Sequence, residues 1–61
     1  MKVRDLILRL EADGWAQLRQ KGSHRQFGHT RKRGVVTVAG HSGEEVPKGT
    51  LNSILKQAGL K

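Results

Sequence analysis

One short basic segment, Lys21 to Arg25, carries the residues most suited to chemistry. It reads Lys-Gly-Ser-His-Arg and places His24 between cationic side chains. Histidine titrates near neutral pH, so it can take or give a proton where such transfer is efficient. RNA cleavage without a metal needs such a group, because the 2′-OH loses a proton as it attacks the adjacent phosphate. His24 could therefore act as general base or general acid, although its spacing alone favours an exposed turn histidine without a role.

The neighbours of this histidine are candidates for holding a phosphate. Lys21 and Arg25 flank the segment and could stabilise charge on the scissile group, although a solvated basic face is an equally good interpretation. Gly22 has no side chain and would let a phosphate approach the backbone closely. Ser23 is a typical turn residue whose hydroxyl bonds to the backbone or contacts a phosphate. For Arg19 the solvated face is the preferred interpretation.

A second candidate is the run Arg31, Lys32 and Arg33, the densest charge cluster in the chain. It is predicted to be a loop that contacts RNA phosphates, with a solubilising loop as the alternative. His29 is expected to share a strand face with Phe27 and Arg25. It could line an RNA groove there, but a plain surface residue is the preferred interpretation.

The aromatic residues are assigned to the core, and the histidines do not form a metal or cofactor site. Trp15 and Phe27 are the two aromatic residues; either could stack on an unpaired base, but the core is the preferred assignment for both. The histidines at 24, 29 and 41 lack carboxylate or cysteine partners at ligand spacing, so no metal site and no cofactor is predicted.

Charge indicates the class of partner. The chain has 61 residues, 12 Lys and Arg against 5 Asp and Glu, and a net charge of +7. Such a field favours polyanions, and nucleic acid is preferred over a membrane surface because no Lys-rich amphipathic helix with aromatic anchors is present. The first apolar run is interrupted by charged residues, which excludes a signal peptide or membrane span there. A single domain, residues 1–61, in the cytoplasm is expected.

Apolar spacing predicts the elements that position these residues. A helical stripe from Lys2 to Asp13 ends at Gly14, and strands are predicted over Trp15 to Lys21 and Arg25 to His29. In the first of these strands, Ala16 and Leu18 alternate with polar residues, as in a half-exposed strand. Between the strands, Gly22 and Ser23 are typical of a two-residue hairpin turn, which would place Lys21 opposite His24.

The second half of the chain supplies one more strand and one more helix. A strand is predicted over Val35 to Ala39, and a helix begins at Pro47 and ends before Gly59. The order is helix, three strands, helix. We therefore predict an α+β fold in which two helices pack on one face of a three-stranded antiparallel sheet and leave the other face open.

Three segments of this order resemble the HicA family of toxins: Lys21-Gly22-Ser23-His24, the strand Gly34 to Val38, and the helix Gly49 to Leu60 with the sequence GTLNSILKQAGL. The resemblance covers nearly the whole chain. It implies a double-stranded-RNA-binding-like fold, ribosome-independent mRNA cleavage without a metal, and inhibition by a HicB antitoxin that covers the active face. Because His24 stands at the matched position of the family motif, the resemblance also makes it the preferred catalytic residue. Family members commonly run from the third strand into Val-Pro-x-His, and this chain lacks that proline, so no role is carried over to His41.

Two other functions fit the same charge and fold. One is a non-catalytic RNA-binding module that recognises RNA shape through its basic face. The other is an interaction protein whose basic face docks an acidic partner. Cleavage that depends on His24 separates the toxin from both.

Overall fold

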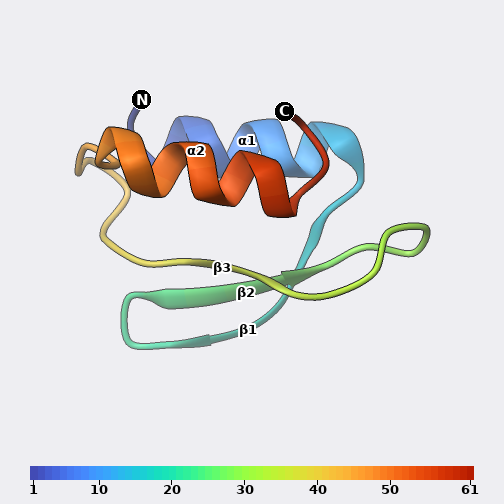
Figure 1. Ribbon diagram of the computed structural model, residues 1–61. Helices are drawn as coiled ribbons and strands as arrows, with labels where there is room; N and C mark the ends of the chain where they lie inside the picture. The colour runs from blue at the N-terminus through green and yellow to red at the C-terminus, as the bar shows by residue number, and fades with distance from the viewer.

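The computed structural model describes residues 1–61 and contains two helices and three strands. In chain order they are α1 (Val3–Asp13), β1 (Ala16–Lys21), β2 (His24–Gly28), β3 (Val36–Val38) and α2 (Lys48–Gln57). Both helices lie over the same face of the sheet, and the opposite face is uncovered (Figure 1). The predicted α+β architecture is confirmed. No helix combines the length and the apolar character that crossing a membrane requires.

The sheet is antiparallel with the strand order β1-β2-β3. At the hairpin end Lys21 pairs with His24, as predicted, and Gly22 in the turn has a φ of 60°. Such a positive φ is readily adopted by glycine and strained for residues with a Cβ. The hairpin therefore fixes the position of His24 at the tip of β2.

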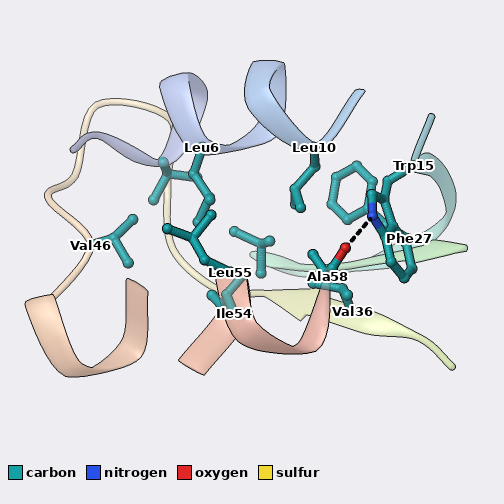
Figure 2. Close-up of a cluster of buried hydrophobic side chains, with 11 residues drawn as sticks. Leu6, Leu10, Trp15, Phe27, Val36, Val46, Ile54, Leu55 and Ala58 are labelled. Carbon is teal, nitrogen blue, oxygen red and sulfur yellow. Dashed lines mark hydrogen bonds between the residues drawn. The ribbon is translucent and has the colours of Figure 1, made fainter. Parts of the chain in front are cut away.

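The core lies between the helices and the sheet (Figure 2). It contains eleven buried residues: Val3, Leu6, Leu10, Trp15, Phe27, Val36, Val38, Val46, Ile54, Leu55 and Ala58. Trp15 is 2% exposed, and its indole Nε1 donates to the carbonyl oxygen of Ala58 at 3.3 Å. The Trp15 ring thereby joins the end of α1 to the end of α2, and both aromatic residues occupy the core as predicted.

One strand differs from its predicted packing. The alternation in β1 predicts a half-buried strand, but all six residues of β1 are exposed and Leu18 is 63% exposed. The register shifts between Gln17 and Arg19, so Leu18 is a bulge residue. Leu18 lies beside Gly28 on the uncovered face of the sheet. It is exposed because the helices cover only the other face. The alternation is present in β1, but no helix or second sheet packs against the apolar side of this strand.

Candidate active site

The uncovered face of the sheet, here called the open face, presents two rows of polar side chains. The row at the hairpin end consists of Lys21 and His24, which are paired in the register. The next row, here called the middle row, runs across all three strands through Arg19, Gln26 and Thr37. Residues of successive rows share the face because strand side chains alternate with a period of two.

The two rows line one concave surface of about 790 Å³. Its lining consists of Arg19, Lys21, Gly22, His24, Gln26 and Thr37. Two of these residues are permanent cations and none is acidic. A site with this charge selects an anionic ligand, and its volume accommodates a nucleotide.

His24 is exposed within this concavity. The hydrogen bonds around it run from the Arg19 Nε to the Gln26 Oε1 at 2.6 Å and from the Gln20 amide to the Gly22 carbonyl at 2.9 Å. Neither uses the imidazole. The second bond links the Gln20 side chain to the turn, and both nitrogens of the His24 ring remain without a hydrogen-bond partner.

A family match follows from comparison of the whole chain with known proteins. The family described as HicA toxin of bacterial toxin-antitoxin matches residues 3–60. The chain belongs to the HicA toxin family. A similar solved structure, described as a toxin-antitoxin complex from Streptococcus pneumoniae, is 36% identical, covers 98% of each chain and superposes with a TM-score of 0.80. Among curated proteins no sequence matches. The resemblance inferred from the sequence is confirmed.

One predicted contact residue of this HicA toxin, Arg25, lies on the other face of the sheet from His24. Arg25 pairs with Val38, which is 1% exposed in the core, so the Arg25 side chain starts from the helix-covered face. Ser23 is half-buried in the turn. The structure thus brings Lys21 and Gly22 together with His24 on the open face, and it does not bring Arg25 there.

The loop between β2 and β3 divides its three cations between two roles. Arg31 and Arg33 are exposed. Lys32 instead donates from its Nζ to the Asp13 Oδ2 at 2.6 Å and to the Ala58 carbonyl at 2.9 Å. The first of these hydrogen bonds, aided by the positive charge of Lys32, lowers the pKa of the Asp13 carboxyl below its ordinary value, although desolvation opposes the shift. Lys32 therefore ties the loop to the ends of both helices.

The expectation that His29 is a plain surface residue is wrong. Its side chain is only 7% exposed. Its Nδ1 accepts hydrogen bonds from the backbone N–H groups of Arg31 at 2.9 Å and Lys32 at 3.2 Å, so its proton is on Nε2, which donates to the Asp13 carbonyl at 2.7 Å. The ring also meets Trp15 edge to face, with centroids 5.2 Å apart. The prediction that His29 shares a face with Phe27 is correct, but that face is the covered one.

The remaining histidine, His41, lies in the loop between β3 and α2. Its side chain is 83% exposed, and its Nε2 lies 4.0 Å from the Glu44 carboxylate. The three histidines thus occupy three separate places. Nowhere do three His, Cys, Asp or Glu side chains form a group that could hold a metal ion.

The middle row is not predicted as a unit from the sequence. From the sequence, Arg19 is assigned to a solvated face, and Gln26 and Thr37 are not singled out as site residues. The signal is present in the strand period, since Gln26 follows His24 by two residues and must share its face. What the sequence lacks is the bulge at Leu18, which sets Arg19 opposite Gln26.

Proposed function

We propose that this HicA toxin is an mRNA endoribonuclease that works without a metal, with His24 as its catalytic residue. The observation that supports this most directly is the exposed imidazole at the hairpin tip, opposite Lys21 and inside a concavity without carboxylates. Family membership supports the same function.

The proposed reaction is attack by the RNA's own 2′-OH on the adjacent phosphorus. A bond forms between the 2′ oxygen and phosphorus as the bond from phosphorus to the 5′ oxygen breaks. His24 either takes the 2′-OH proton as base or gives a proton to the leaving 5′ oxygen as acid, and water completes the other transfer. The products are a 2′,3′-cyclic phosphate and a 5′-OH.

Charge stabilisation in this scheme comes from the hairpin end. The Lys21 ammonium would lie against the non-bridging phosphate oxygens, where negative charge develops. Gly22 leaves the backbone open to close approach, since a Cβ there would have no neighbour within 4 Å. Ser23, Arg31 and Arg33 would contact phosphates further along the RNA strand, with Lys32 holding the loop that carries the two arginines. Arg25 has no phosphate contact in this scheme, because its side chain starts from the covered face.

We further propose that a HicB-like antitoxin binds this chain and covers the open face. The similar Streptococcus pneumoniae structure is described as a toxin-antitoxin complex, and its likeness extends over 98% of this chain. A net charge of +7 suits a partner that presents acidic groups. Covering the concavity at His24 would exclude mRNA by occupying the same surface.

The test compares wild type, His24→Ala and His41→Ala on an mRNA transcript in EDTA. His41→Ala is the matched control, because it removes an exposed histidine outside the site. We expect His24→Ala to lower the cleavage rate by about 100-fold or more, while His41→Ala cleaves like wild type. End analysis should find cyclic phosphate and 5′-OH.

Other results would contradict the proposal in distinct ways. Undiminished cleavage by His24→Ala removes the catalytic role of that residue, and a 5′-phosphate product removes the 2′-OH mechanism. Cleavage that stops in EDTA shows a metal requirement. RNA binding by a wild type that cleaves no transcript would instead favour the non-catalytic RNA-binding module.

A further inference from the structure

The middle row carries a hydrogen-bonding pattern that the proposed cleavage does not use. We propose that Arg19, Gln26 and Thr37 read the base of the nucleotide next to the scissile phosphate and select a keto base, guanine or uracil. This inference rests on the proposed function, because it takes the phosphate to lie at His24.

The contact between Arg19 and Gln26 fixes the direction of the Gln26 amide. A guanidinium has donors and no acceptor, so the amide atom 2.6 Å from the Arg19 Nε must be the oxygen. The Gln26 Nε2, with two N–H groups, then faces away from this bond. Arg19 is thus a positioning residue for Gln26, and its own terminal nitrogens keep their donors for a ligand.

Apart from the His24 ring at the hairpin end, the concavity offers few free acceptors. The Gln26 Oε1 is occupied by Arg19, and the Gly22 carbonyl is occupied by the Gln20 amide at 2.9 Å. The Thr37 hydroxyl can adapt to either role, and no carboxylate lines the surface. A ligand that fits must therefore present acceptors toward the middle row.

Base edges differ in this respect. All four bases carry acceptors, but they differ at one exocyclic position: guanine O6 and uracil O4 are acceptors, whereas the adenine N6 and cytosine N4 amino groups are donors. Against the Gln26 Nε2 an amino group would set donor against donor. The middle row therefore distinguishes bases by whether this exocyclic group is a keto oxygen or an amino group.

Spacing places a base at this row. The middle row lies two residues along the strands from Lys21 and His24, which is about 7 Å at 3.3 to 3.4 Å per residue. A phosphate held at the hairpin end would leave the base of its neighbouring nucleotide over the middle row.

The sharpest test compares oligouridylate with oligocytidylate, two pyrimidines that differ in the keto or amino group at position 4. Both are 12-mers with 2′-O-methyl groups, so the 2′-oxygen cannot attack and binding is measured without cleavage. Fluorescence anisotropy should show that the wild type binds oligouridylate about fivefold or more tightly than oligocytidylate.

Three variants separate the roles within the row. Gln26→Glu replaces donors with acceptors and should abolish or reverse the preference for uracil. Arg19→Met frees the amide to present either atom and should equalise the two oligomers. Gln17→Glu is the control, with the same charge change on β1 at a position that pairs with the buried Phe27, and it should keep the wild-type preference.

The outcomes for the two proposals are distinguishable. Equal binding of the two oligomers by wild type, or an unchanged preference in Gln26→Glu, overturns base reading while leaving cleavage by His24 standing. Uracil preference that is lost in Gln26→Glu, in a protein that cleaves no transcript, keeps base reading and removes the nuclease. Where cleavage occurs, cut sites in a randomised transcript should be enriched in guanine and uracil at one position beside the cut.

Discussion

His24 and His29 stand five residues apart and differ in every respect that matters for function. His24 is exposed on the open face, and its ring is used by none of the neighbouring hydrogen bonds. His29, just after β2, is 7% exposed on the covered face, and both of its ring nitrogens are hydrogen-bonded. The same side chain is thus available for chemistry in one place and committed to structure in the other.

The hydrogen-bond partners of a histidine ring therefore determine whether that ring can act on a ligand in this fold. A ring whose two nitrogens already have partners can act on a ligand only by breaking bonds that hold the fold. A ring without partners contributes little to stability, so it can be removed without unfolding the protein. Stability and activity should therefore respond to different histidines.

The largest expected effect on stability comes from His29→Ala. It removes the acceptor of two backbone N–H groups, the donor to Asp13, and the edge contact with Trp15. We expect the free energy of unfolding to fall by about 2 to 4 kcal/mol. Urea unfolding followed by circular dichroism measures it.

His24→Ala is the control for that measurement and should change the free energy of unfolding by no more than about 0.5 kcal/mol. If the two alanine variants unfold at the same urea concentration, the division between a structural and a catalytic histidine is wrong.

A smaller effect is expected at the exposed part of the same loop. Changing both Arg31 and Arg33 to Gln should weaken RNA binding without altering stability, since both side chains are exposed. The slope of log affinity against log salt concentration should decrease by about 0.7 for each phosphate that the variant no longer neutralises. A salt titration of RNA binding measures this, and an unchanged slope would show that the loop only solubilises the protein.

The smallest effect concerns acid stability at Asp13. The pKa of its carboxyl is lowered in the folded protein, mainly by the hydrogen bond from Lys32. A lowered pKa stabilises the fold fully above the unfolded value, about 3.9, and this contribution is lost as the pH falls through the folded pKa. Asp13→Asn should therefore lose stability at neutral pH and show a shallower decline below pH 4. A parallel pH dependence in wild type and variant would contradict this.

The sequence predicts the elements well and their partners poorly. Gly14, with a φ of 107°, ends α1 as expected, and the turn at Gly22 sets Lys21 opposite His24. These features depend on local conformation, which neighbouring residues determine. The position of His24 at the hairpin end follows from the same local turn.

What the sequence could not predict depends on long-range contacts. Nothing near His29 in the chain shows that the Asp13 carbonyl, sixteen residues away, accepts from its ring. Likewise, Lys32 stands in a run of three cations and is not distinguished from the two arginines by the sequence. Only its hydrogen bonds to Asp13 and Ala58 in the fold give it a different role. The bulge at Leu18 is a shift in pairing that alternation alone conceals.

Trp15 is the sole tryptophan, and the chain has no tyrosine. Ultraviolet emission therefore arises essentially from one indole, which is buried against His29 and bonded to Ala58. A red shift in that emission reports loosening where the two helices end. This indole lies on the covered face of the sheet, opposite the concavity. Its emission can therefore follow unfolding while a dye on an oligonucleotide independently reports RNA binding in the same sample.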